Sequence, residues 1–243
     1  MFKKIFKKIY KLKLKKIKKR YDKKLQTEIE KYVSILNHDV RTALLAQIQS
    51  LNLFLSNKAP KDILYEVLNS NYFIYEIIEN TVFLSHYENC KNNLRLENID
   101  ITNEANNICK KIEQFAHFKN QNIILKTNSK NIICKADKFL INKIIHNLLT
   151  SSVSYGFENS EIEVNIKENK NTISFSAKNK SVYMTKEKIR NILADKKTYD
   201  FNQLGMNLNL NIANKLITAH HWDVIAHSDK NNTSTFGFIV KKC

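Results

Sequence analysis

The chain has 243 residues, of which 43% are hydrophobic, a content that is ordinary for a globular protein and excludes disorder throughout. Its formal net charge of +17 is concentrated at the start, because residues 1–24 supply +12 and the other 219 residues only +5. No stretch reaches the roughly 18 apolar residues of a membrane span, and the basic start lacks the apolar core of a signal peptide. We therefore expect a cytoplasmic protein.

The first 24 residues predict a basic amphipathic helix. Apolar side chains share one side of it, at Phe2, Ile5, Phe6, Ile9 and Tyr10. Lysines occupy the opposite side, a pattern typical of a helix that lies on an anionic membrane surface, here the inner face of the membrane. A merely solvated lysine-rich helix is an equal alternative, and a nucleic-acid-binding arm is less favoured.

Residues 25–90 predict two long helices joined by a turn at residues 57–59. In the first helix, apolar residues recur within an arc of roughly 120°, at Ile29, Val33, Leu36, Val40, Leu44, Ile48, Leu51 and Leu55. Pro60 suits the first turn of the second helix, which runs to about Asn89. One hairpin cannot bury both apolar stripes, so we expect two copies to form a four-helix bundle, making the protein a homodimer.

His38 and Thr42 lie one helical turn apart and outside the apolar stripe, at roughly 180° and 220° on the wheel that starts at Ile29. A histidine in an apolar segment is more often a buried core residue, but the wheel places this one toward solvent or a partner. Leu45 and Leu53 fall on the same side, interleaved with Gln49. Apolar residues on an otherwise polar face indicate a docking surface.

After residue 91 strands and helices alternate, which predicts a mixed α/β domain over residues 91–243. Strands are expected at residues 94–96, 122–126, 131–134, 162–166, 172–177, 224–226 and 234–240. Helices are expected at residues 101–118, 137–153 and 208–219.

Metal and disulfide chemistry is not indicated. The four cysteines, Cys90, Cys109, Cys134 and Cys243, lie far apart without paired spacing, so we expect reduced, buried thiols. Three histidines at 220, 221 and 227 have no neighbours that complete a ligand set, and no metal site is predicted.

Three motifs, taken in order, resemble a two-component sensor histidine kinase of the HisKA type. Residues 37–44 resemble the phospho-acceptor box with His38 at the phosphorylated position, and residues 84–88 resemble the end of the second dimerisation helix. Residues 137–149 resemble the entry to the asparagine box, whose first asparagine is Asn147. The resemblance covers residues 25–243. It implies an α then α+β chain, in which an antiparallel helical hairpin that dimerises into a four-helix bundle precedes an ATPase-like two-layer α/β sandwich.

The metal- and phosphate-binding positions depart from that family pattern. Ser151 and Ser154 stand where the family carries a second asparagine and a lysine that help hold Mg²⁺ and the phosphates. Asn207 and Asn209 stand where the pattern has glycines at the lid and the following helix, and the chain has only three glycines. Asparagine tolerates positive φ better than most residues.

The adenine side departs as well. Asn179 aligns with the aspartate that accepts the adenine amino group, and Ser181 and Tyr183 align with the two glycines that follow. Each lost phosphate ligand or charge-linked hydrogen bond costs about 1.5 to 3 kcal/mol, so several together predict a loss of kinase activity by several powers of ten. Asn147 and Asn179 are then vestigial cofactor-binding residues, and we do not expect bound ATP.

The resemblance still implies a reaction that needs no ATP: dephosphorylation of a response regulator, with Mg²⁺ supplied by the regulator's own acidic pocket. We expect His38, Asp39 and Thr42 to be catalytic, and the regulator's receiver domain to dock on Arg41, Leu45, Gln49 and Leu53. Two other functions are open: an active ATP-dependent kinase that autophosphorylates His38, and a non-enzymatic scaffold held at the membrane by residues 1–24.

Overall fold

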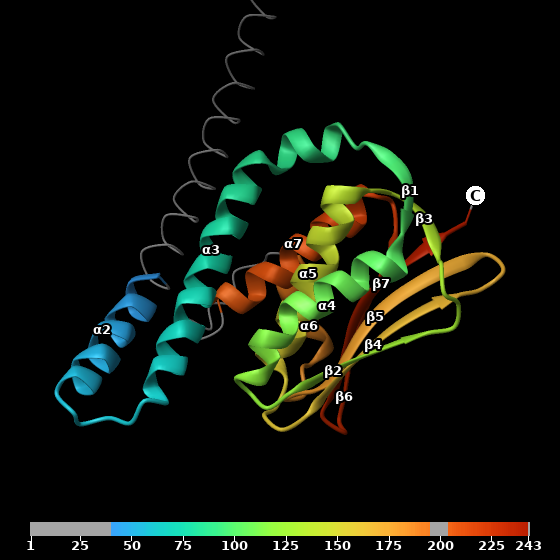
Figure 1. Cartoon of the computed structure of the whole chain (residues 1–243). Helices are drawn as coiled ribbons and strands as arrows, with labels where there is room; N and C mark the ends of the chain where they lie inside the picture. Colours follow the sequence, from blue (N-terminus) through green and yellow to red (C-terminus); the bar gives the residue numbers. More distant parts are fainter. Residues whose placement is uncertain (1–39, 195–203, 243) are drawn as a thin grey trace, which may run out of the picture.

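The chain folds into a helical hairpin followed by a sheet covered with helices on one face (Figure 1). The computed structural model describes residues 40–194 and 204–242, without the side chains of residues 88, 89, 91, 92 and 204–207. The helices are α2 (Arg41–Leu55), α3 (Ile63–Asn92), α4 (Ile101–His117), α5 (Lys138–Tyr155), α6 (Lys186–Leu193) and α7 (Leu204–Ala219). The strands are β1 (Leu96–Asp100), β2 (Asn122–Thr127), β3 (Ile133–Asp137), β4 (Glu161–Glu168), β5 (Thr172–Lys180), β6 (Asp223–Asp229) and β7 (Thr233–Lys241). None of the helices in these two ranges is both long and apolar enough to cross a membrane.

Helices α2 and α3 form the hairpin that the sequence predicts, with its turn where expected. The hydroxyl of Ser56 donates to the carbonyl of Asn52 at 2.6 Å and closes the end of α2. Asn57 follows with φ of 54°, in the left-handed region that asparagine tolerates. The chain therefore reverses direction before Pro60, and α3 begins at Ile63.

The face that α2 turns toward α3 is not the predicted apolar stripe. Buried or half-buried residues of α2 lie at Ala43, Gln47, Ser50 and Phe54, and the hydroxyl of Ser70 in α3 donates to the carbonyl of Ala43. The expected stripe at Leu44, Ile48, Leu51 and Leu55 is instead exposed, by between 38% and 76%. Within one chain α3 covers only one row of α2, so Ala43, Gln47, Ser50 and Phe54 line the hairpin seam and the row of large aliphatic side chains remains outside.

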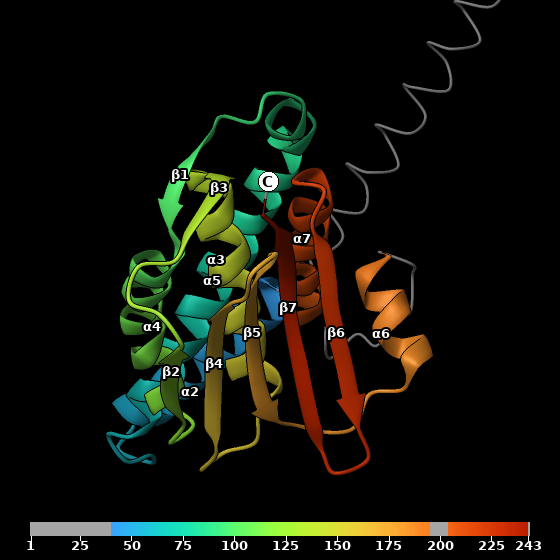
Figure 2. The same ribbon diagram turned by 90° about the vertical axis from the view of Figure 1, so that its right-hand side faces the viewer.

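The second part of the chain is a two-layer α/β sandwich. A five-stranded sheet has the order β2-β4-β5-β7-β6, with β2 parallel to β4 and the other neighbours antiparallel. Helices α4, α5 and α7 cover one face (Figure 2). The core between the layers includes Ile144, Ile145, Phe175 and Phe238, which are fully buried, and the two phenylalanine rings stack at 5.4 Å between centroids. This is the sandwich that the sequence predicts.

Element boundaries agree with the predictions in most places. Three of the helices begin at side-chain caps, where the carboxylates of Asp100 and Asp137 and the hydroxyl of Thr185 accept backbone N–H groups of the first turn. One predicted strand was misplaced and one helix was missed. Strand β1 lies at Leu96–Asp100 rather than residues 94–96, because Ile99 pairs with Cys134 of β3 and buries its side chain. The short helix α6 was not predicted at all.

Candidate functional site

Thr42 lies on an exposed face of α2 together with Leu45, Gln49 and Leu53, which we name the Thr42 face. All four side chains are exposed, the two leucines by 52% and 46%. On a helical wheel they fall within an arc of roughly 80°. The structure therefore places on one surface the residues that the wheel grouped together. His38 and Asp39, the other two predicted catalytic residues, lie outside the described residues.

Arg41 is exposed at the edge of this surface, roughly 40° around the helix from Leu45. It lies roughly 100° around the helix from Thr42, between the Thr42 face and the apolar stripe. The stripe and the Thr42 face lie on opposite sides of the seam with α3, so a second helical hairpin could cover the stripe and still leave Thr42 accessible.

The long helix α3 packs directly on the helices of the sandwich (Figure 1). Asn80, which is fully buried, donates a hydrogen bond to the side chain of Asn209 in α7. The hydroxyl of Tyr87 donates to the carbonyl of Lys215, also in α7, at 3.1 Å. These contacts fix the hairpin against the domain through hydrogen bonds that span more than 120 positions in the sequence.

Ionisable groups meet at the same interface. The carboxylate oxygen Oε1 of Glu76 in α3 lies 2.8 Å from Nε2 of His146 in α5, within hydrogen-bonding distance. Burial lowers the pKa of the nearby Lys143, while the charges of Glu76 and Glu79 partly offset that shift. Sequence reasoning missed this cluster. The signal was present as polar residues at Glu76 and Asn80, four apart and flanking the buried Ile77.

The residues predicted as vestigial cofactor ligands are deeply buried. Both polar atoms of the Asn147 amide lie away from solvent without a hydrogen-bond partner in the part of the chain that the structure describes. Oδ1 of Asn179 is likewise buried without a hydrogen-bond partner among the described residues. Its Nδ2 donates to the carbonyl of Lys180 at 3.5 Å. Asn147 and Asn179 therefore retain unused hydrogen-bonding capacity.

The neighbouring serines, in contrast, are used within the fold. Ser151 donates to the carbonyl of Asn147, one turn earlier in α5, at 2.7 Å. Ser181 donates to the hydroxyl of Ser234 at 2.7 Å, and Ser234 donates in turn to Ser228 at 3.0 Å. These hydroxyls are therefore engaged within the fold.

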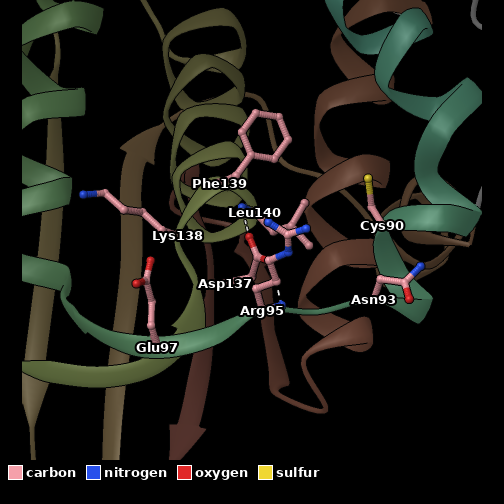
Figure 3. Close-up of a pocket in the computed structure, with 8 residues that line it drawn as sticks. All are labelled: Cys90, Asn93, Arg95, Glu97, Asp137, Lys138, Phe139 and Leu140. Atoms are coloured by element: carbon pink, nitrogen blue, oxygen red, sulfur yellow. Dashed lines mark hydrogen bonds between the residues drawn. The ribbon is translucent and has the colours of Figure 1, made fainter.

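A separate pocket of about 300 Å³ lies where the chain passes from α3 to the sandwich (Figure 3). Its lining comprises Cys90, Asn93, Arg95, Glu97, Asp137, Lys138, Phe139 and Leu140. The carboxylate of Asp137 accepts the backbone N–H of Arg95 at 3.0 Å and that of Leu140 at 3.1 Å. One carboxylate thus ties the connection after α3 to the first turn of α5.

Comparisons with known proteins agree with this architecture. Residues 136–242 match the family of histidine kinase-, DNA gyrase B- and HSP90-like ATPases. The heme sensor protein HssS of Staphylococcus saprophyticus is 21% identical over 225 residues, which cover 90% of this chain and 48% of that protein. The chain therefore spans about half the length of this curated relative.

Solved histidine kinases share the fold. The histidine kinase AdeS of Acinetobacter baumannii superposes with a TM-score of 0.59 at 15% identity, covering 84% of this chain and 97% of that one. Histidine kinase ThkA, solved in complex with the response regulator protein TrrA, gives 0.60 at 16% identity over 92% of this chain and 66% of that one. The catalytic domain of ThkA alone superposes with a TM-score of 0.55 at 17% identity, covering 61% of this chain and 96% of that one. Residues 136–242 thus match the family of histidine kinase-, DNA gyrase B- and HSP90-like ATPases, and the fold of the described chain is similar to that of solved histidine kinases.

Proposed function

We propose that this protein acts in two-component signalling mainly as a phosphatase of a phosphorylated response regulator, with kinase activity weak or lost. The observation that carries the proposal is the Thr42 face, where Thr42 and two leucines are exposed residues on one side of α2. The solved complex of ThkA with the response regulator protein TrrA supports the kind of partner, since ThkA has a similar fold.

Three described residues at positions of the family's nucleotide-binding pattern are engaged elsewhere in the fold, which supports the proposed loss of kinase activity. Asn209, at the position where the family pattern has a glycine, is buried and receives the hydrogen bond of Asn80. The hydroxyl of Ser181 donates a hydrogen bond to Ser234, and the hydroxyl of Ser151 donates to a carbonyl of its own helix. The carboxylate of Glu76 lies in a cavity beside Ser154 and Asn209, where it would repel a polyphosphate. We therefore assign no step to ATP.

The proposed chemistry is hydrolysis of the regulator's aspartyl-phosphate. The Thr42 hydroxyl would orient a water molecule in line with the bond between phosphorus and the aspartate oxygen, and that aspartate leaves as the water oxygen attacks, giving inorganic phosphate. Mg²⁺ bound in the regulator's own acidic pocket would neutralise the phosphoryl charge. Because the hydroxyl acts by positioning, the sandwich domain contributes rigidity rather than a reacting group.

The test uses receiver domains of response regulators from the same cell. Each domain is phosphorylated with a small-molecule phosphodonor, and the remaining phosphodonor is then removed. The full chain should shorten the lifetime of the aspartyl-phosphate without any nucleotide. Thr42→Ala should slow this reaction by about tenfold to a hundredfold, which corresponds to the loss of one hydrogen bond to a charged group. Thr42→Ser, which keeps the hydroxyl, should retain most of the rate.

The controls separate chemistry from docking. Leu53→Glu should raise the concentration of receiver domain needed for half-maximal rate, since it places a charge on the docking surface. His38→Gln tests the predicted histidine in the same assay. If Thr42→Ala and wild type dephosphorylate at equal rates, Thr42 is not the positioning residue. If wild type leaves every receiver domain phosphorylated, the protein is not a phosphatase.

An active ATP-dependent kinase is the second candidate, and the unused amide groups of Asn147 and Asn179 favour it. Transfer of labelled phosphate from ATP to the protein, lost in His38→Gln, would establish that activity.

A further inference from the structure

A small cavity lies where the hairpin meets the sandwich domain. Tyr72, Phe73 and Glu76 of α3 form one side, and Phe115 of α4 and Asn209 of α7 contribute to the other. Its volume is about 80 Å³, room for several water molecules or for a ligand of a few heavy atoms. The rings of Tyr72 and Phe115 meet edge to face at 4.6 Å between centroids, so the wall is rigid and aromatic.

One carboxylate oxygen at this cavity needs a donor. Oε1 of Glu76 contacts His146, but its Oε2 is buried with no hydrogen-bond partner among the described residues. An acceptor left unpaired on a charged group costs about 1–3 kcal/mol or more.

We propose that this cavity binds a small organic ammonium ion. Its N–H groups would donate to Oε2 of Glu76, and its alkyl carbons would contact Tyr72, Phe73 and Phe115, whose ring faces attract a cation. The same carboxylate disfavours an anion, including a phosphate. Since α3 supplies one wall and α4, α5 and α7 the other, a bound cation would also stabilise the packing of the hairpin on the domain. The proposal does not depend on the phosphatase reaction.

The test is calorimetric titration of the full chain with n-butylammonium, with 1-butanol and butyrate as neutral and anionic analogues of similar size. We expect saturable binding of the ammonium ion alone. Glu76→Gln should weaken it at least about tenfold, the effect of losing one charge-assisted hydrogen bond. Glu79→Gln removes an equal charge three residues away, where the side chain is exposed and does not line the cavity, and should change affinity little.

His146→Gln controls for the loss of the contact between α3 and α5. It leaves the Glu76 carboxylate in place, so butylammonium should bind as well as to wild type or more tightly. Tyr72→Leu should weaken binding several-fold while circular dichroism shows the same helix content. Equal affinity for butanol and butylammonium, equal losses in the Glu76 and His146 variants, or no saturable binding to wild type would each overturn the proposal.

Discussion

Two asparagine side chains connect α3 with α7. Asn80 and Asn209 are both buried and hydrogen-bonded to each other, and Asn209 stands where the family pattern has glycine. A glycine there could offer no side-chain partner to α3. Asn209 therefore makes a side-chain contact between the hairpin and the sandwich domain that a glycine could not make.

The first prediction follows from this pair. Asn80→Ala should lower the free energy of unfolding by about 1–3 kcal/mol, because the Asn209 amide would remain buried without its partner. Urea denaturation followed by circular dichroism measures the change. Asn71→Ala, an exposed position of the same helix, is the matched control and should cost less than about 0.5 kcal/mol. Equal losses in both variants would show that the pair contributes nothing specific.

His220 gives a pH-dependent prediction. Burial lowers the pKa of His220 below its usual 6.5, and its Nε2 accepts the backbone N–H of Asp137, which requires the neutral ring. Folding therefore gains stability from neutral His220 above pH 6.5, and this stability is lost as the pH falls through the lowered pKa. The free energy of unfolding measured in urea should therefore fall as the pH decreases through this range, and it should fall less in His220→Gln.

Trp222, the only tryptophan of the chain, reports on that titration directly. Its ring lies 4.4 Å from that of His220, between centroids. Fluorescence of the native protein should change with a midpoint below pH 6.5. A midpoint at or above 6.5 would contradict the proposed burial of a neutral imidazole.

Single-residue patterns predicted the surface of α2 better than the interior contacts. Counting along the helix identified the exposure of Thr42, Gln49 and Leu53, because a helical wheel depends on local geometry alone. The Glu76–His146 and Asn80–Asn209 contacts could not be predicted in this way. They join positions at least 70 residues apart, and no local pattern specifies which polar residues meet across a domain boundary.

Among the elements, the two hairpin helices carry apolar rows that nothing in the described chain covers. On α2 the row is Leu44, Ile48, Leu51 and Leu55, and on α3 it is Leu64, Leu68, Tyr75, Ile78 and Val82. The spacings of four and three are those of facing helices in a bundle. A second copy of the hairpin is the partner we propose for both rows.

Replacing one residue of these rows by a charge should break the dimer. Ile48→Glu or Val82→Glu would place a carboxylate in the centre of the proposed bundle, and burying it unpaired should weaken dimerisation at least a hundredfold. Sedimentation equilibrium of the full chain measures this. Leu53→Glu, on the Thr42 face, should leave the dimer intact. A monomeric wild type would contradict the bundle, as would a dimer that tolerates both charged variants.

Helix α6 shows which elements a sequence pattern misses. It spans only Lys186–Leu193 and buries two side chains, Ile189 and Ile192, so its apolar periodicity is too short to recognise. Thr185 followed by Glu187 in the first turn was the available signal, since a threonine cap and an early acid mark a helix start. The longer helices α4 and α5 were found because each carries several turns of periodic apolar residues.

Taken as a whole molecule, the chain combines a helical hairpin that exposes apolar side chains with an ATPase-like domain. The order of hairpin and sandwich was predictable, because helical periodicity gives way to alternating strands near residue 91. The packing of α3 against α7 was not, and it is this packing that fixes the hairpin relative to the domain. We infer that the Thr42 face works on a preformed scaffold without nucleotide.

The most direct measurement follows the aspartyl-phosphate of a receiver domain in two parallel reactions with the full chain, one with ATP and Mg²⁺ and one with Mg²⁺ alone. We expect the same shortened lifetime in both reactions, and no labelled phosphate on the protein when the ATP is labelled. A lifetime shortened only when ATP is present, or phosphate transferred from ATP to the protein, would contradict this expectation.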